Sequence, residues 1–259
     1  MALAEDLHEL LISWLDGHPG LFVLGVSGAQ GSGKSTLVAE LAQRLSADGL
    51  RVATLSLDDL YRTRAERQIL AGQVHPLFAT RGVPGTHDVA LGLATIAALA
   101  RGEAARLPRF EKGCDDRAPE GEWPLAPADT QVLLLEGWCL GAAPQPAADL
   151  ALPVNSLEAA EDPDGTWRGY ANTALSRDYP ALWARIDRLV FLAAPDWAVV
   201  AHWREQQEAE LRQRAPAAMT PAEVTRFIQH YERLTRWMLA ELPDRADLTL
   251  RLDTERRVI

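Results

Sequence analysis

The segment "GAQGSGKST", residues 28–36, has the residue types and spacing that phosphate binding requires. It matches the P-loop pattern G-x-x-x-x-G-K-[ST] and lies between an apolar run and a helical pattern. Glycines let backbone N–H groups approach phosphate oxygens, and the start of the helix adds its positive dipole end. A chance match in a chain of this length is roughly a one-in-a-hundred event. We therefore expect a nucleotide to be bound by Gly28, Ala29, Gln30, Gly31, Ser32, Gly33, Lys34, Ser35 and Thr36.

Two side chains of this loop and one acid further along suit a nucleotide with Mg²⁺. Lys34 can place a point charge on the terminal phosphates, and Ser35 can offer its hydroxyl to Mg²⁺. Glu136 directly follows the apolar run 132–135, and a run this apolar would rarely end in an unpaired carboxylate. We expect Glu136 to be the second metal contact, although aspartate is usual there. The alternative is an ordinary acid at the end of a strand.

Two adjacent carboxylates, Asp58 and Asp59, follow a second apolar segment in "LSLDDLY", residues 55–61. Successive side chains of an extended chain point to opposite faces, so the two aspartates should differ in role. Alternation places Ser56 on the same face as Asp58. It does not by itself say which aspartate faces a reacting group.

The elements that must position these residues alternate between strand and helix patterns, which favours an α/β fold with a mostly parallel sheet flanked by helices. Strands are predicted at 21–28, 50–57, 131–138 and 186–195, and a fifth is suggested at 247–253. Helices are predicted at 34–49, 87–101, 196–214 and 221–241, and the N-terminal segment has the spacing of a docking helix. Residues 106–130 and 141–180 are less regular. We interpret them as insertions in a single domain that spans 1–259.

Composition narrows the possible partners. The chain has 259 residues and a net charge of −10, without the basic footprint that nucleic-acid binding needs. No apolar run is long enough to cross a bilayer, and the N-terminus does not resemble a signal peptide, so we expect a cytoplasmic protein that binds neither nucleic acid nor membrane. Cys114 and Cys139 form no metal motif. Nothing in the sequence indicates the oligomeric state.

Lysine is scarce in this chain. Of the 26 basic residues only Lys34 and Lys112 are lysines. Lysine offers a compact, mobile ammonium where arginine offers a planar fork, so both positions are candidates for binding phosphate or substrate. A solvated lysine is the alternative for Lys112.

Among P-loop proteins, the motifs of other classes are absent. The chain has no N-K-x-D segment for guanine and no ABC-type signature, and "DPDG" at 162–165 follows no strand and is interpreted as a turn. Kinases of small molecules remain. "GAQGSGKST", "LSLDDLY" and "LLLEGW" together resemble the group of phosphoribulokinase, uridine kinase and pantothenate kinase.

Within that group the chain is most similar to the D-glycerate 3-kinase family and its bacterial and fungal relatives. The similarity is carried by "RGVPGTHD" (81–88), "PRFEK" (108–112), the Asp116–Arg117 pair, "WREQQE" (203–208) and "VTRFIQHYERLTRWM" (224–238). It extends from about residue 21 to the C-terminus. Two departures bear on the acceptor and not on kinase activity: "KGCDDR" is short, and residues 153–172 are typical of a bacterial branch.

The resemblance implies transfer of the γ-phosphoryl group of ATP, with Mg²⁺, to a hydroxyl of a small metabolite, D-glycerate being the best match. ATP follows from the missing guanine motif and the resemblance. The alternatives are another sugar acid, a nucleoside or a pantothenate-like alcohol as acceptor, or a nucleotide-binding regulator with little turnover.

The resemblance also assigns roles to residues. Asp58 stands at the position of the general base, and the alternative for it is a hydrogen bond to a metal-bound water. Lys34 and Arg204, the latter on a lid helix, would act on the transferring phosphoryl group. A sugar-acid carboxylate needs a charge-assisted donor, which suits Arg81 with His87. Thr86 is also a candidate N-cap of the following helix. The substrate-binding set is Asp58, Tyr61, Arg81, Thr86, His87, Lys112 and Arg117.

Overall fold

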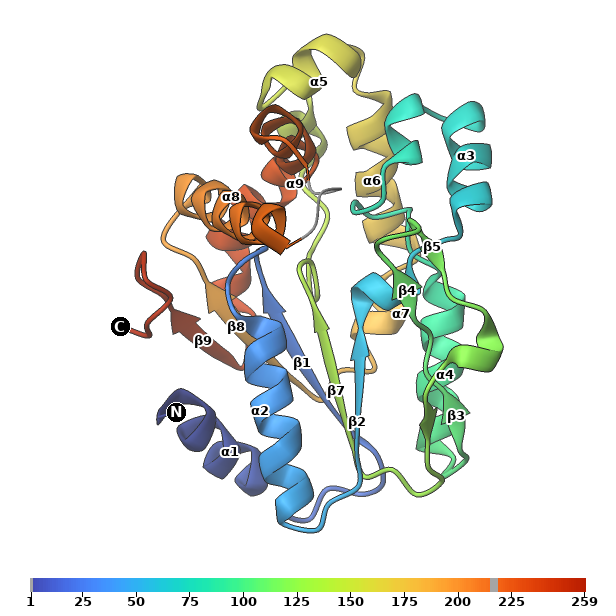
Figure 1. Ribbon diagram of the computed structural model, residues 1–259, viewed down its shortest axis with the longest axis vertical. Helices are drawn as coiled ribbons and strands as arrows, with labels where there is room; N and C mark the ends of the chain where they lie inside the picture. The colour runs from blue at the N-terminus through green and yellow to red at the C-terminus, as the bar shows by residue number, and fades with distance from the viewer. Residues whose placement is uncertain (1, 215–218) are drawn as a thin grey trace.

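The computed structural model describes residues 2–214 and 219–259, and its centre is a five-stranded sheet in the order β2-β7-β1-β8-β9 (Figure 1). Every neighbouring pair in this sheet is parallel. Its strands are β1 (Phe22–Gly28), β2 (Val52–Ser56), β7 (Val132–Gly137), β8 (Arg188–Ala193) and β9 (Leu248–Arg251). The α/β fold with a mostly parallel sheet is confirmed, and each strand starts and ends within two residues of its predicted bounds.

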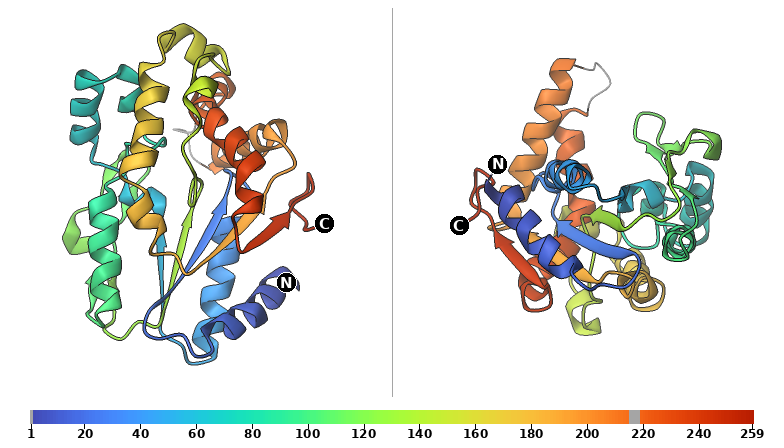
Figure 2. Two further views of the ribbon diagram at one scale, coloured as in Figure 1. Left: turned by 180° about the vertical axis from the view of Figure 1, so that it is seen from behind. Right: turned by 90° about the horizontal axis from the view of Figure 1, so that it is seen from below.

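Helices cover both faces of the sheet (Figures 1 and 2). One core lies against α1 (Ala2–Leu15), α2 (Lys34–Ala47) and α8 (Trp197–Arg214). The other lies against α4 (Val89–Ala100), α6 (Thr166–Arg177), α7 (Pro180–Trp183) and most of the apolar face of α9 (Pro221–Glu241). In β7, Val132 and Leu134 face the first core while Leu133 and Leu135 face the second. This explains why the segment is apolar at every position.

The N-terminal helix packs as its spacing predicts. Leu7 and Leu11 of α1 are buried against α2 in the first core. Among the residues that the structure describes, no helix is both long and apolar enough to cross a membrane.

The segment between residues 105 and 126, which the sequence shows as irregular, forms two pairs of short strands. β3 (Ala105–Arg106) pairs with β6 (Leu125–Ala126), and β4 (Phe110–Glu111) pairs with β5 (Asp116–Arg117), both antiparallel. The second pair is a hairpin whose tip, residues 112–115, reaches the site described below. α3 (Arg64–Gln73) lies beside this hairpin.

Residues 141–180 are more helical than predicted, because they contain α5 (Ser156–Glu161) and α6 as well as the start of α7. Polar residues and Gly169 interrupt the apolar spacing of α6, so its sequence shows no clear helical stripe. The carboxylate of Asp162 accepts the N–H groups of Trp167 and Arg168 and so stabilises the start of α6. The turn prediction for 162–165 is confirmed, since these residues join α5 to α6.

The start of α4 corrects one helix-cap prediction. Asp88 is the N-cap residue, because its Oδ1 accepts the Leu91 N–H at 3.0 Å. Thr86 is not the cap. Its hydroxyl donates to the Val83 carbonyl at 2.7 Å and accepts the Gly82 N–H at 3.1 Å, which closes the turn before the helix.

Candidate active site

The P-loop joins β1 to α2 and leaves the first N–H groups of that helix open. Gly31 and Gly33 have φ values of +79° and +89°, which other residues rarely adopt. A side chain at Gly31 would also meet Trp203 of α8, since an ideal Cβ there lies 2.7 Å from the Trp203 Cβ. Gly33 is the N-cap of α2 and offers no side chain to the helix. The helix end is therefore free to bind an anion.

Three oxygen-bearing side chains meet beside this loop at the ends of β2, β7 and the P-loop. Glu136 Oε1 accepts hydrogen bonds from Ser35 Oγ at 3.1 Å and from Ser56 Oγ at 2.9 Å. Parallel pairing of β2 with β7 sets Ser56 opposite Glu136, so the two side chains must converge. Lys34 Nζ lies 4.0 Å from Glu136 Oε2. Hard oxygen donors of this kind fit Mg²⁺.

A cavity of about 220 Å³ opens next to these donors. Its lining includes Ser35, Ser56, Glu136 and the side chains of Asp59 and Arg109. Ser35, Ser56 and Glu136 thus border open space, which is also lined by Val38 and Ala39 of α2.

Asp58 and Asp59 differ in role because the chain turns between them and the strand. β2 ends at Ser56, and a short 3₁₀ helix, η1 (Leu57–Leu60), follows. The argument from strand alternation therefore does not reach Asp58, which is placed instead by the Ser56 hydroxyl that caps the turn and accepts the Asp58 N–H. Asp59 caps the same turn and binds the Arg109 guanidinium at 2.8 Å and the Phe110 N–H at 3.0 Å. Its contacts hold the segment that leads into β4.

The Asp58 carboxylate has two donors and an ionised resting state. Lys112 Nζ lies 2.8 Å from Oδ2, and the Tyr61 hydroxyl donates to Oδ1 at 2.9 Å. Burial by itself would raise the pKa of Asp58, but the charges of Lys112 and Lys34 and the Tyr61 hydrogen bond lower it to about 2. By contrast, burial raises the pKa of Asp59.

The segment "RGVPGTHD" brings His87 against Tyr61. The two rings are stacked, with centroids 4.7 Å apart, and His87 Nδ1 lies 2.6 Å from the Tyr179 hydroxyl. Burial lowers the pKa of His87 to about 3, so the ring is neutral. Its Nε2 is buried and has no hydrogen-bond partner in the described part of the chain.

The remaining predicted substrate and lid residues already have protein partners. Arg117 donates to the Tyr61 carbonyl at 2.9 Å and to Asp88 Oδ2 at 3.3 Å. Arg81 is paired with Asp115, and the Thr86 hydroxyl is used within its turn. Arg204 pairs with Glu208 one turn along α8, and its guanidinium lies 5.6 Å from the centre of the Phe227 ring. Their roles toward a substrate stay predictions.

Four residues near the site were not singled out by sequence reasoning. Ser56 could have been found from the pairing of β2 with β7, which sets it opposite Glu136. Arg67 is fully buried. It lies three residues before Leu70 and four before Ala71, which both pack against the core, so an arginine on the apolar face of α3 is the sequence signal that could have identified it. Asp115 binds Arg67 and Arg81. Arg256 donates to the Gly31 carbonyl at 2.6 Å from the far C-terminus, and no sequence signal predicts this contact.

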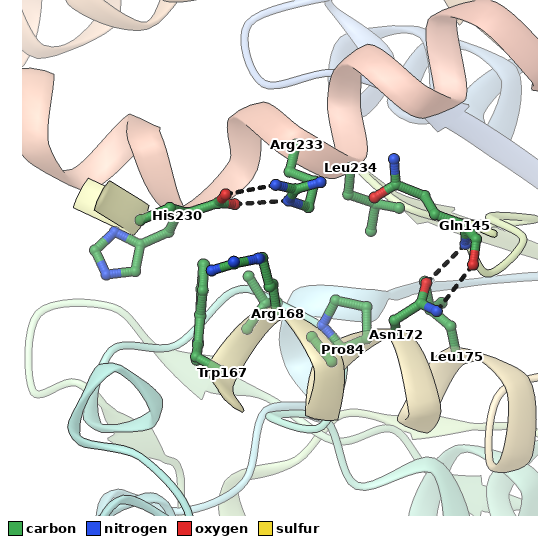
Figure 3. A pocket seen from close by; sticks show the side chains of 12 residues that line it. Pro84, Gln145, Trp167, Arg168, Asn172, Leu175, His230, Arg233 and Leu234 are labelled. Carbon is green, nitrogen blue, oxygen red and sulfur yellow. Dashed lines mark hydrogen bonds and ion pairs between the residues drawn. The ribbon is translucent and has the colours of Figure 1, made fainter. Parts of the chain in front are cut away.

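A second cavity lies behind the loop 81–88, between α6 and α9 (Figure 3). It measures about 30 Å³ and is lined on one side by Val83 and Pro84. Figure 3 shows the ion pair that Arg233 makes beside it and the paired hydrogen bonds that join Asn172 to Gln145. Its volume is on the order of two water molecules, so it cannot hold a nucleotide or a sugar acid.

Comparison with known proteins bears on the family and the fold of this chain. Residues 6–65 match the family described as "Methylmalonyl Co-A mutase-associated GTPase MeaB", a stretch that includes the P-loop. An uncharacterized kinase of Schizosaccharomyces pombe, mug58, is 35% identical over 89% of this chain and 87% of its own length. The chloroplastic D-glycerate 3-kinase of Arabidopsis thaliana is 33% identical over 92% of this chain, which spans 54% of that longer protein. The structure of D-glycerate 3-kinase from Cryptococcus neoformans superimposes with a TM-score of 0.83 at 26% identity, covering 100% of this chain and 98% of the other.

The fold and the site define a P-loop small-molecule kinase. Within this class, the chain belongs to the family that contains D-glycerate 3-kinase and its fungal kinase relatives. The resemblance stated from the sequence motifs is thereby confirmed.

Proposed function

We propose that this kinase transfers the γ-phosphoryl group of ATP, with Mg²⁺, to a hydroxyl group of a small hydroxy acid, and that D-glycerate is the first candidate. The observation that carries the proposal is the ionised Asp58 carboxylate, which lies near Lys34 of the P-loop and is flanked by Lys112 and Tyr61. A nucleotide switch has no need of such a partly buried carboxylate beside its phosphates.

The residues of the P-loop would hold ATP through the open helix end and the Lys34 charge. Ser35, Ser56 and Glu136 would hold Mg²⁺, which when bound would offset the charge of the phosphates. Ala29, Gln30 and Thr36 belong to the same nucleotide-binding segment.

Asp58 would accept the proton of the acceptor hydroxyl. As that O–H bond breaks, the oxygen forms a bond to the γ-phosphorus, and the bond from phosphorus to the departing ADP oxygen breaks. The depressed pKa keeps Asp58 ionised and ready, while most of the rate comes from positioning and charge. Lys112 would move from Asp58 toward the transferring phosphoryl group, which a mobile ammonium can do more easily than a guanidinium.

Two cations that pack on the same aromatic cluster as Tyr61 support an anionic acceptor. Arg67 and Arg81 flank the Phe110 ring at 5.5 and 5.3 Å, and Phe110 in turn contacts Tyr61 with ring centroids 5.3 Å apart. Guanidinium groups suit carboxylates better than they suit nucleosides or neutral alcohols. D-glycerate itself is taken from the names of two relatives, and other hydroxy acids fit the same chemistry.

A screen of ADP release tests the proposal. The purified chain is given ATP and Mg²⁺ with D-glycerate, other hydroxy acids, nucleosides, pantothenate and glycerol in turn. We expect D-glycerate to stimulate ADP release most, with phosphoglycerate formed in equal amount. Stimulation by a nucleoside or pantothenate alone would contradict the acceptor class, and no stimulation above the water background by any compound would favour the regulator.

A further inference from the structure

The tip of the β4–β5 hairpin, residues 112–115, touches the site at two points. Lys112 reaches the base Asp58, and Asp115 reaches Arg67 and Arg81. Both tip side chains are partly in solvent, 64% exposed for Lys112 and 37% for Asp115. The Cα atoms of residues three apart in a tight turn lie within about 7 Å, so one short tip contacts both the base and the cations.

Asp115 contacts two cations, and the charge of Asp116 also acts on one of them, Arg67. Arg67 Nη2 donates to Asp115 Oδ2 at 2.7 Å and to the Asp115 carbonyl at 2.8 Å, while Arg81 binds Oδ1. Two guanidinium groups thus share one carboxylate. The Arg67 side chain is 0% exposed, and its Nε and Nη1 are buried without a partner among the described residues. Burial is the largest influence on the pKa of Arg67 and lowers it.

Buried N–H groups of a charged side chain are costly when they have no acceptor. A carboxylate in the place of Asp115 could accept from Arg67 Nη2 and from Arg81 in the same way. Asp115 is also held in a backbone conformation that aspartate adopts only rarely, with φ of +55°. The contact is therefore made by a strained residue at the partly exposed tip of a short hairpin.

We propose that Arg67 and Arg81 form the carboxylate-binding element of the acceptor site, and that Asp115 occupies this element until the carboxylate of the acceptor displaces it. This inference rests on the proposed function, because it takes the acceptor to be a hydroxy acid. It adds Arg67, a residue buried behind Phe110, to the binding element, and it makes Asp115 a competitor of the substrate. Displacement of Asp115 would also let the tip move Lys112 off Asp58, so binding of the acid would expose the base.

A purely structural role for Asp115 makes the opposite prediction. If Asp115 only orients the two arginines, its loss should weaken acceptor binding. If it competes with the acceptor, its loss should strengthen binding. The sign of the change in KM therefore separates the two.

The test compares Asp115→Asn with Glu111→Gln, which removes one negative charge from an exposed side chain of the same hairpin. We expect Asp115→Asn to lower the KM for D-glycerate about three- to tenfold, a change of one charge-assisted contact, with kcat within about twofold of wild type. Glu111→Gln should leave both unchanged. A KM for Asp115→Asn that is equal to or above the wild-type value would overturn the inference.

A binding measurement gives the same answer without turnover. D-Glycerate and lactate should raise the Tm of Asp115→Asn more than that of wild type or Glu111→Gln, while glycerol at the same millimolar concentration should act equally on all three. Arg81→Gln, whose side chain is partly exposed, should lose the carboxylate-dependent rise. Equal rises in Asp115→Asn and wild type would refute displacement even if D-glycerate proves to be the acceptor. A failed ADP-release screen with these shifts intact would count against the proposed function alone.

Discussion

Lys112 Nζ and Asp58 Oδ2 lie 2.8 Å apart, so one of the two lysines of the chain neutralises the carboxylate that stands next to the P-loop. The contact joins an exposed hairpin tip to a carboxylate on η1. It keeps Asp58 ionised and at the same time covers it. If Lys112 moves away when substrates bind, the ionised carboxylate becomes accessible as a base.

Removal of the Asp58 charge should abolish transfer and leave nucleotide binding intact. We expect Asp58→Asn to bind ATP like wild type and to lose at least about a hundredfold in kcat, the scale of a positioned base. Binding can be measured by calorimetry and transfer by ADP release. Wild-type kcat in this variant would exclude Asp58 as the base.

The neighbouring aspartate provides a matched comparison. Asp59→Asn removes the same charge one residue along, but Asp59 contacts Ser56, Arg109 and Phe110 instead of the reacting groups. We expect it to affect kcat much less than Asp58→Asn, with its main cost in stability.

Lys112 should set the pH at which Asp58 takes up a proton. Without its ammonium, the pKa of Asp58 rises, because burial then acts against weaker opposing charges. A base works only when deprotonated, so the acid limb of kcat/KM should move to higher pH in Lys112→Met. Profiles from pH 4 to 8 should show an acid limb in Lys112→Met and none from Asp58 in wild type, and Lys112→Arg, which keeps the charge, should behave like wild type. The same limb in Lys112→Met and wild type would contradict this control of Asp58.

The sequence predicts the sheet and the P-loop well because both depend on local patterns. Apolar runs such as 132–135 and the spacing of Gly28, Gly33 and Lys34 determine them within a few residues. Contacts between residues far apart in the sequence could not be predicted in this way. Nothing near Arg67 in the chain indicates that Asp115, 48 residues away, would be its partner, nor that Arg256 would reach the P-loop. The helix α6 was missed because packing and a cap at Asp162, not an apolar stripe, determine it.

Ser56 should tune the metal site, since its hydroxyl donates to Glu136 Oε1 and accepts the Asp58 N–H. We expect Ser56→Ala to raise several-fold the Mg²⁺ concentration needed for half-maximal activity, with a stability loss of about 1 kcal/mol from the missing cap. Glu136→Gln should raise the Mg²⁺ requirement more. The exposed Ser46→Ala on α2 serves as the control. A Mg²⁺ titration of Ser56→Ala that overlays the wild-type curve would remove Ser56 from the metal site.

Two ion pairs join α5 to α9 and should differ in their effect on stability. Glu158 and Arg233 are buried, and Arg233 also donates to the Asp149 and Leu152 carbonyls. Glu158→Gln leaves that guanidinium without its counter-charge, and we expect a loss of about 3–5 kcal/mol in the free energy of unfolding. The exposed pair of Glu161 with Arg226 is the control, and Glu161→Gln should cost under about 1 kcal/mol. Urea unfolding measures both. Equal losses in the two variants would show that burial does not decide the strength of these contacts.

His230 should make the fold sensitive to acid. Its ring is buried beside Trp167 on the small cavity of Figure 3, and burial lowers its pKa to about 4. Between pH 6.5 and 4 the unfolded chain therefore binds a proton that the folded chain does not, so this residue destabilises the fold increasingly as the pH falls through that window. On going from pH 7.5 to 5, wild type should lose about 2 kcal/mol more of its unfolding free energy than His230→Phe, which has a ring of similar size and no titrating group. The exposed His202→Gln should behave like wild type. Parallel losses in His230→Phe and wild type, measured by urea unfolding at both pH values, would mean that His230 is protonated in the folded protein.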